Sequence, residues 1–280
     1  MKSVSLGYSP CPNDTFIFYA LIHGKIDTKG LTFDEVLLDV ETLNQKALSA
    51  ELDLTKISFH AFGRLREQYC LLHSGSALGR GCGPLVITKK NYSMDDLRKR
   101  TIAIPGKLTT AYLLLQLYDP QFALNNSNII EMPFHEIITA VADEKADAGL
   151  IIHESRFTYP SYGLTAIMDL GKWWEDETGL PIPLGGIAAR RTLKDGPGRD
   201  IDRFLKQSVE YAFANRSEPM GYIKNHSQEL SEDVISRHID LYVNDYSVDI
   251  GTEGKKAVKE LISRAEDSGI ISKINRSLFM

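Results

Sequence analysis

The segment LIIHESRFTY, residues 150–159, places a histidine directly after an apolar, strand-like run. His153 is flanked there by Glu154 and Arg156. A histidine side chain titrates near neutral pH, which suits the removal of a proton from a hydroxyl or a carbon acid. A hydrogen-bonded structural histidine fits the same pattern. His153 is therefore a candidate general base, with a structural role as the alternative.

A lysine and a serine end the strand-like run LTKIS, residues 54–58. Lys56 and Ser58 alternate with Ile57, and alternate residues of a strand point to the same face. A lysine at the end of a strand is usually solvated. Paired with a serine in a cleft, however, Lys56 would suit an anionic and hydroxylated ligand.

The segment SPCPNDTF, residues 9–16, follows the strand-like VSLGY and contains two prolines. Proline fixes its own φ at about −65° and disfavours helix for the residue before it, so the strand must stop and turn. We expect Asn13 or Asp14 to cap the helix that follows, which Gly24 ends. A helix N-terminus beyond a strand end is also a site for a carboxylate or a hydroxyl. Capping and ligand binding both remain open for this pair.

A second turn of this kind is PGKLTTAYLLL, residues 105–115. A strand ends at Pro105, and Thr109 or Thr110 can cap the helix that follows. The threonine that is not the cap would be free to bind a ligand oxygen. The segment is not a phosphate-binding loop, because Gly-x-x-x-x-Gly-Lys-Ser/Thr is not matched.

Other catalytic templates fail on spacing. The His-Glu-x-x-His motif of zinc proteases needs a second histidine where Phe157 stands. The glycine-rich GRGCGPLVI, residues 79–87, precedes a strand instead of opening a helix, so the dinucleotide fingerprint does not apply. No Gly-x-Ser-x-Gly nucleophile turn is present in the sequence. Arg80 remains a candidate for binding a carboxylate, since its guanidinium offers a planar fork of donors.

Composition narrows the class of protein. Cys11, Cys70 and Cys82 are an odd number without Cys-x-x-Cys spacing, so neither a disulfide framework nor a zinc knuckle is indicated. A formal net charge of −5 without a basic cluster argues against nucleic acid and favours a small-molecule ligand. No stretch approaches the roughly 18 apolar residues of a membrane span. The sequence opens on a strand instead of a signal peptide, so we expect a cytoplasmic protein.

The candidate residues follow strands in an alternating pattern of strands and helices. Apolar runs such as TIAIP and AGLII are each followed by a helical pattern, which is typical of an α/β fold with largely parallel sheets. Ligands of such sheets bind beyond the carboxyl ends of the strands. The helical tail, about residues 200–267, is expected to cover the first lobe, and its charges indicate only solvation.

A faint internal repeat indicates two similar lobes. Aligning Asp53 with Asp147 places VETLNQKALSAELDLTKIS on FHEIITAVADEKADAGLII. Leu43 then matches Ile137, and both copies run from a helix through an acidic turn into a strand. Chance similarity between two ordinary helix and strand units is the alternative.

The boundaries of the lobes follow from two long strand-like segments, residues 83–90 and 183–191, as the expected crossings. The first lobe would comprise 1–88 plus 189–280, and the second, inserted lobe 89–188. Gly185 and Gly186 are candidate hinge points, because small residues often absorb the dihedral changes of domain closure. Accommodation of close packing is the alternative.

Five segments together resemble the 1,4-dihydroxy-6-naphthoate synthase family, which serves the futalosine route to menaquinone. They are SPCPNDTFIFYALIHG, TKIS, GKLTTAYLLL, LIIHESRFTY and LYVNDYSVDIG. The match runs nearly end to end, and SPCPNDTF is its most specific part. The resemblance implies a bilobal fold similar to type 2 periplasmic binding proteins, with a ligand cleft between the lobes.

The resemblance also implies an activity and a set of residues. Members of the family are carbon-carbon lyases that convert cyclic dehypoxanthinylfutalosinate to 1,4-dihydroxy-6-naphthoate and a three-carbon fragment, without a known metal or organic cofactor. Carried over by position, His153 is the proton acceptor. The implied substrate contacts are Lys56, Ile57 and Ser58 on one segment and Thr109 with Thr110 on another, with Ala111 as a neighbouring possibility. Asn13, Asp14 and Arg80 are added from the physical arguments above.

Two rival functions remain from the sequence. A non-catalytic protein that binds a small anion would share the fold, since fold does not determine function. Chorismate dehydratase of the same pathway is similar in fold, but its early segment resembles Ser-Tyr-Leu-Asn more than Ser-Pro-Cys-Pro-Asn-Asp. The residues here favour the synthase. The oligomeric state does not follow from the sequence.

Overall fold

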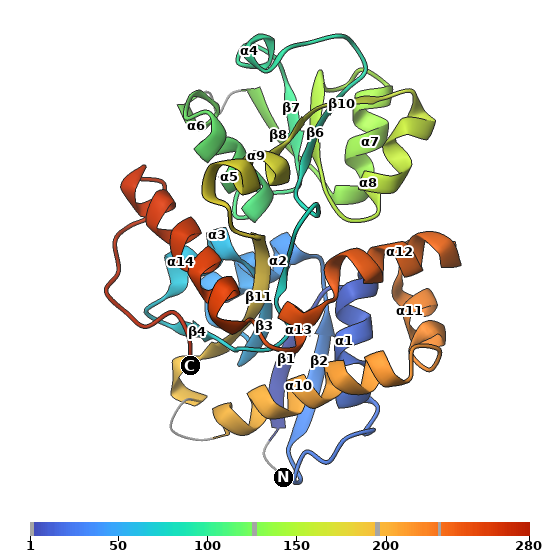
Figure 1. Cartoon of the computed structure of the whole chain (residues 1–280), viewed down its shortest axis with the longest axis vertical. Helices are drawn as coiled ribbons and strands as arrows, with labels where there is room; N and C mark the ends of the chain where they lie inside the picture. Colours follow the sequence, from blue (N-terminus) through green and yellow to red (C-terminus); the bar gives the residue numbers. More distant parts are fainter. Residues whose placement is uncertain (1–2, 125–127, 194–196, 229–230) are drawn as a thin grey trace.

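Strands and helices alternate along the chain, and the strands form two separate sheets. The computed structural model describes residues 3–124, 128–193, 197–228 and 231–280. Figure 1 shows the two sheets in separate lobes, one above the other, each flanked by helices. The expected α/β fold with two lobes is confirmed.

The first sheet combines the N-terminal strands with one late strand. Its strands, in spatial order, are β2 (Thr32–Leu37), β1 (Ser3–Tyr8), β3 (Leu54–Ser58), β11 (Ile182–Arg190) and β4 (Tyr69–Leu71), with β5 (Ala77–Gly79) also paired to β11. The second sheet lies wholly within the middle of the chain. Its spatial order is β10 (Thr165–Asp169), β6 (Leu85–Thr88), β9 (Ala148–Ile151), β7 (Ile102–Ile104) and β8 (Ile129–Glu131).

Both sheets are mixed, which corrects the expectation of largely parallel sheets. The pairs of β1 with β2 and β3, and of β7 with β8 and β9, are parallel. β11 is antiparallel to β3, and β6 is antiparallel to β9. The reason lies in the connections: a strand that arrives from the other lobe enters its new sheet at the edge where the parallel strands end. It must therefore run in the opposite direction.

Helices flank the sheets and fill the space between the lobes (Figure 1). No helix in the described ranges is long and apolar enough to cross a membrane. The helices are α1 (Pro12–Ile22), α2 (Val40–Leu48), α3 (Phe59–Leu65), α4 (Met94–Leu97), α5 (Thr110–Tyr118), α6 (Gln121–Leu124), α7 (Phe134–Ala142), α8 (Ser155–Thr158), η2 (Tyr159–Tyr162), α9 (Leu170–Thr178), η3 (Arg191–Leu193), α10 (Gly198–Ala214), α11 (Met220–His226), α12 (Glu232–Tyr242), α13 (Asp245–Val248) and α14 (Gly251–Asp267).

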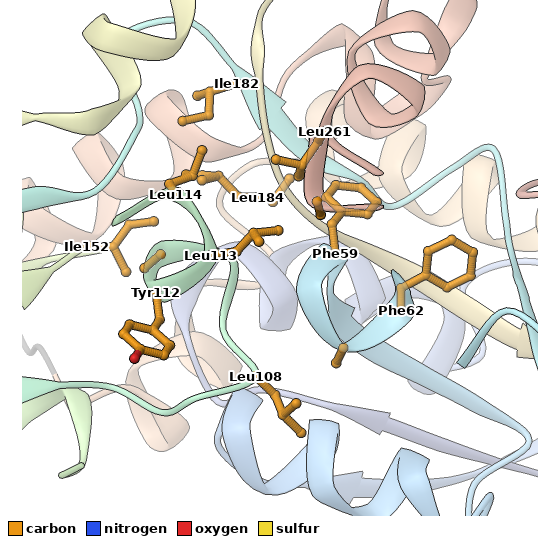
Figure 2. Packing of buried hydrophobic residues seen from close by; sticks show 14 of the residues in the cluster. Phe59, Phe62, Leu108, Tyr112, Leu113, Leu114, Ile152, Ile182, Leu184 and Leu261 are labelled. Carbon is orange, nitrogen blue, oxygen red and sulfur yellow. The ribbon is translucent and has the colours of Figure 1, made fainter. Parts of the chain in front are cut away.

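One buried apolar cluster joins the two lobes. It contains side chains from α3 and β11 of the first lobe and from α5 of the second, together with Leu261 of α14. Burial of each large apolar side chain contributes about 1.5–3 kcal/mol relative to exposure. Figure 2 shows these side chains gathered around Leu113, Leu114, Leu184 and Phe59. The lobes therefore share a core and hold each other in place.

The chain crosses between the lobes twice, once just before β6 and once just before β11. β5 of the first sheet leads to β6 of the second through residues 80–84, and α9 leads back to β11 through residues 179–181. The segments expected as crossings thus contain β6 and β11, and each strand pairs within one sheet. The division of the chain into lobes at residues 88 and 189 stays a prediction. The strand pairings place the two crossings just before β6 and β11.

Gly185 and Gly186 lie inside β11, where they pair with Ser58 and Ile57 of β3. A Cβ atom on Gly185 would lie 2.8 Å from the backbone oxygen of Ile57. A Cβ on Gly186 would lie 3.3–3.4 Å from Leu71 and Phe59. The packing interpretation of these two glycines is therefore the one that the structure supports, since β11 approaches β3 too closely for a side chain at Gly185.

The internal repeat is present in the backbone. α2 and β3 correspond to α7 and β9, and β3 and β9 pair in parallel with β1 and β7. Both turns after the helix contain a left-handed residue at the matching position, Ala50 with φ 51° and Glu144 with φ 59°. In each case the next residue donates its backbone N–H to the carbonyl five residues earlier. This ending is common among helices, so the agreement is compatible with a repeat but does not by itself exclude chance similarity.

The aligned aspartates make the same hydrogen bonds in both lobes. Asp53 accepts from the backbone N–H and the hydroxyl of Ser5, whose Oγ accepts from the Asp53 N–H. Asp147 accepts from the N–H and hydroxyl of Thr101, whose Oγ1 accepts from the Asp147 N–H. Each aspartate thereby sets the register between two parallel strands. The strand ends that carry the candidate residues are positioned by this shared device.

Candidate active site

His153 lies just beyond β9, at the junction of the two lobes. Its backbone has φ 61°, a left-handed conformation that is unusual for a residue other than glycine. Its N–H donates to the hydroxyl of Tyr242 in α12, 3.1 Å away. Its ring makes an edge contact with Phe134 and lies parallel to the ring of His238, with centroids 5.4 Å apart. Contacts from both lobes therefore hold the imidazole in place, on a backbone in a sparsely populated conformation.

His238 is absent from the candidates drawn from the sequence, although its ring lies against that of His153. It lies on the buried face of α12 with Ile235, Ile239 and Tyr242, and its side chain is fully buried. Its Nε2 lies 2.9 Å from Oδ1 of Asn13. The available signal was a histidine on the apolar stripe of an amphipathic helix. The tail was expected to cover the first lobe, and it also brings this histidine to His153.

The hydrogen-bond network determines the tautomer of His238. Asn13 donates from Nδ2 to the carboxylate of Asp14 at 2.9 Å, so its Oδ1 must face the histidine and accept from Nε2–H. A neutral His238 then carries a lone pair on Nδ1. That atom has no hydrogen bond within the described residues and lies 3.6 Å from the carboxylate of Glu154.

Burial keeps both imidazoles neutral. It lowers the pKa of His153 to about 4, with the neighbouring His238 as a further cause. It lowers the pKa of His238 to about 3. Removing an imidazolium from water is unfavourable, and this cost outweighs the opposing attraction of the nearby carboxylates of Glu154 and Asp14, so the uncharged form is preferred. At neutral pH, His153 therefore has the lone pair that a base requires.

Asp14 and Lys56 form a buried ion pair next to the histidines. The Lys56 Nζ lies 2.6 Å from Asp14 Oδ1, and the side chains are 7% and 1% exposed. The other carboxylate oxygen of Asp14 accepts from the N–H and the hydroxyl of Ser9. An ion pair removed from water is stable only when such hydrogen bonds satisfy the remaining groups. Lys56 is thus buried in an ion pair and is not solvated, which excludes the first of the two possibilities drawn from the sequence.

The expected capping role of Asn13 and Asp14 is wrong. α1 begins at Pro12, its N-cap is Cys11, and no side chain caps it. Both residues lie within the first turn, and their side chains turn away from the helix axis toward His238 and Lys56. The helix ends as expected, with Gly24 in a left-handed conformation after the C-cap. The first turn of α1 therefore presents polar groups to His238 and Lys56.

Thr109 and Thr110 have different roles. Thr109 is the N-cap of α5, and its Oγ1 accepts from the N–H of Tyr112. The other threonine was expected to be free, but the hydroxyl of Thr110 donates to the carbonyl of Leu184 and accepts from the N–H of Phe59 at 2.9 Å. Thr110 thus joins the lobes through hydrogen bonds. Ala111 is buried in the apolar core.

Ser58 and Ile57 are buried at the end of β3. The Ser58 hydroxyl accepts from Asn44 Nδ2 at 3.1 Å, and its N–H donates to Asn44 Oδ1. Asn44 also donates to Glu41, whose carboxylate accepts from the N–H of Leu108 in the other lobe. The side chain of Ile57 is fully buried in the apolar cluster. The end of β3 is therefore linked to the turn before α5 through Asn44 and Glu41 of α2.

Arg80 lies outside this cluster. It is half exposed in the passage between the lobes, where it pairs with Glu253 and donates to the carbonyl of Gly179. The passage is also held by Arg156, which donates to the carbonyls of Gly81 and Gly83. The structure does not bring Arg80 together with His153, Lys56 or the threonines.

The comparisons with known proteins agree over nearly the whole chain. The sequence model of the menaquinone biosynthesis family matches residues 4–267. A 1,4-dihydroxy-6-naphtoate synthase of Thermus thermophilus is 48% identical over 280 residues, which cover 100% of both chains. A protein of the same name from Streptomyces coelicolor is 42% identical over 270 residues, covering 96% of this chain and 95% of the relative.

Solved structures give the same result for the fold. A protein of Archaeoglobus fulgidus is 39% identical, with a TM-score of 0.88 over 96% of this chain and 98% of its own. The periplasmic aliphatic sulphonate binding protein of Escherichia coli has a TM-score of 0.67 at 12% identity, over 98% of this chain and 89% of its own. The second likeness concerns the fold alone. By its sequence along nearly its full length, this chain belongs to the menaquinone biosynthesis family that includes these 1,4-dihydroxy-6-naphtoate synthases.

Proposed function

We propose that this chain is a 1,4-dihydroxy-6-naphthoate synthase, a carbon-carbon lyase that acts on cyclic dehypoxanthinylfutalosinate, with His153 as the proton acceptor. Identity of 48% and 42% to synthases along the full chain supports the activity. One observation carries the role of His153: its imidazole lies between the lobes, and its Nδ1 is buried without a hydrogen-bond partner in the described residues. A metabolic substrate of this kind fits a cytoplasmic enzyme.

His153 would remove a proton from a sugar-derived hydroxyl and thereby start the cleavage of a carbon-carbon bond. Its low pKa keeps the ring unprotonated before substrate arrives. An anionic substrate beside the ring would raise that pKa toward neutrality, because a negative charge stabilises the imidazolium. Aromatisation of the naphthalene product supplies driving force for the reaction.

Lys56 and the first turn of α1 would orient the substrate. Lys56 has three donors, and the ion pair with Asp14 uses one of them, so the ammonium can still donate to an anionic group. Contact between the lobes through Thr110 and Glu41 would exclude water from the reacting atoms. The remaining substrate contacts implied by the resemblance, Ser58 and Thr109, lie on the two segments that meet there.

The test is turnover by His153→Asn. General-base catalysis is worth about 10²–10⁴ in rate, so we expect kcat to fall by that factor. The matched control is His135→Asn, because His135 is an exposed histidine on α7 whose loss leaves the site intact. Full activity in a folded His153→Asn protein would remove the histidine from the mechanism.

The same preparation distinguishes the rival functions. Purified protein is incubated separately with cyclic dehypoxanthinylfutalosinate and with chorismate, and the products are identified by mass spectrometry. We expect 1,4-dihydroxy-6-naphthoate from the first substrate only. Dehydration of chorismate would favour the dehydratase, and turnover of neither would favour a binding protein.

A further inference from the structure

Three side chains with metal-ligating atoms meet at His153. The thiol of Cys11, a ring nitrogen of His153 and a carboxylate oxygen of Glu154 all lie within 4.8 Å of one another. Cys11 comes from the turn before α1 in the first lobe, and the other two follow β9 in the second. The proposed reaction uses only the histidine. It leaves the thiol and the carboxylate without a role.

The hydrogen bonds at this cluster are incomplete. The buried Nδ1 of His153 has no partner in the described part of the chain. The carboxylate of Glu154 approaches His238 Nδ1 only to 3.6 Å, and that nitrogen also lacks a hydrogen bond. Buried polar atoms are nearly always satisfied, so the unpartnered nitrogens of two stacked imidazoles beside these side chains point to a group that binds there.

The donor set matches a thiophilic divalent cation. Zinc binds cysteine, histidine and carboxylate at about 2.0–2.3 Å, often with three protein ligands and one open position. Tetrahedral ligands at these lengths lie roughly 3.3–3.7 Å apart, so rotation of the side chains by about an ångström would close the site. A cysteine thiolate and a glutamate carboxylate together balance the charge of the ion. The neighbouring Lys56 and Asp14 neutralise each other.

We propose that Cys11, His153 and Glu154 form a binding site for a thiophilic divalent cation, Zn²⁺ or Cd²⁺, and that the bound cation competes with the substrate. Binding converts the Cys11 thiol to a thiolate and releases its proton to solvent. The cation then occupies the lone pair with which His153 would accept the substrate proton. The competition rests on the proposed function, whereas the binding does not.

The binding is tested without substrate. Cd²⁺ is titrated into the full-length, chelator-treated protein, and the ultraviolet difference spectrum is followed for the thiolate-to-cadmium charge-transfer band. We expect the band to saturate at one ion per chain. Cys11→Ser should lose the band, and Cys82→Ser is the matched control, because Cys82 is buried outside the cluster. Absence of the band in the wild type, or its persistence in Cys11→Ser, would overturn the proposal.

A second variant covers the case in which Cys11→Ser does not fold. Glu154→Gln keeps the shape of the side chain and removes the charge, and we expect it to weaken Zn²⁺ binding by at least about tenfold, measured by calorimetry. Unchanged affinity would count against the site. Inhibition by Zn²⁺ that falls as substrate rises, and that a chelator reverses, would support the competition.

The two proposals fail separately. A protein that gives the cadmium band but turns over no substrate retains the cation site and loses the proposed function. A protein that turns over substrate but gives no band retains the function and loses the cation site.

Discussion

The unit of α2 and β3 in the first lobe and the unit of α7 and β9 in the second follow the same backbone route and end in different chemistry. Their turns share a left-handed residue, and their aspartates share a set of hydrogen bonds to the neighbouring strand. At the end of β3 the chain presents Lys56 and Ser58, whereas the matching positions at the end of β9 are Leu150 and Ile152. The common part builds the scaffold.

The difference between the two units assigns separate tasks to the lobes. The position of Phe59, directly after β3, corresponds to that of His153 after β9. Phe59 is buried in the apolar core between the lobes. His153 instead faces His238 and the polar first turn of α1 in the opposite lobe. In the proposed function, the first lobe supplies a cation and hydrogen-bond donors, and the second supplies the base.

The largest effect on stability should come from breaking the ion pair between Lys56, at the end of β3, and Asp14 of α1. Lys56→Met leaves the buried carboxylate of Asp14 without its counter-charge, which should lower the free energy of unfolding by about 3–5 kcal/mol. Urea unfolding of the variant and the wild type measures this difference in free energy. Lys46→Met is the control, because Lys46 pairs with Glu51 at the surface of the same unit and should cost at most about 1 kcal/mol. Equal losses in the two variants would contradict the assigned burial.

The buried histidines His60, directly beyond β3, and His238, beside the end of β9, should make stability depend on pH. Burial lowers the pKa of His60 to about 4 and that of His238 to about 3. The unfolded chain therefore binds protons first as pH falls, so the stability present above about pH 6.5 is lost as pH falls toward these two values. Each histidine should contribute about 1.4 kcal/mol per pH unit within that window.

His238→Gln separates this contribution from the others. Glutamine keeps an N–H donor for Asn13 and does not titrate. The slope of the unfolding free energy against pH should therefore fall by the contribution of one histidine, about 1.4 kcal/mol per pH unit. Urea titrations at pH 7, 6 and 5 measure both slopes. A slope that is the same in the variant and the wild type would show that His238 is not held neutral.

Replacing the aligned aspartates should sharpen the comparison, because the shared bonds predict similar costs. Asp53→Ala and Asp147→Ala each leave a backbone N–H and a hydroxyl without an acceptor, which should cost about 1–3 kcal/mol in each lobe. Thermal and urea unfolding of the two variants measure the loss of stability. A loss confined to one of them would show that the two turns are not equivalent.

The smallest expected effect is a gain at the left-handed positions of the repeat. Ala50→Gly should stabilise the protein by about 0.5–1 kcal/mol in urea unfolding, since glycine adopts this conformation without the steric cost of a Cβ. At Glu144 the same substitution also removes ion pairs with Lys89 and Lys90, so the gain there should be smaller. Ala47→Gly is the control, because Ala47 lies inside α2 and should lose stability when replaced by glycine. Equal losses at Ala47 and Ala50 would contradict the strain assigned to the turn.

Much of the scaffold could be predicted from the sequence. The strand ends at Ser58 and Ile151 and the helices that flank them follow from apolar periodicity, which depends on neighbouring residues alone. The repeat was visible because the two aspartates and the apolar positions around them keep their spacing. Lys56 and His153 were identified from their position at a strand end.

The remainder of the site depends on contacts that no local pattern contains. His238 lies on a helix far along the chain from Asn13, and only the packing of α12 against α1 brings the two together. Asn13 and Asp14 were expected to cap α1, because the capping pattern does not reveal that Lys56 and His238 offer their side chains other partners. Thr110 was expected to be free, because the sequence does not reveal that the fold brings the N–H of Phe59 and the carbonyl of Leu184 to its hydroxyl.

The sequence by itself determined the family, the alternating elements and the residues that follow the strands, since these depend on residue types and their spacing. The tertiary structure decided which of those residues meet. It buried Lys56 against Asp14, placed His238 beside His153, and left Arg80 outside the cluster. Burial then lowered the pKa of His153, because the cost of charging an imidazole depends on everything packed around it and not on its place in the chain.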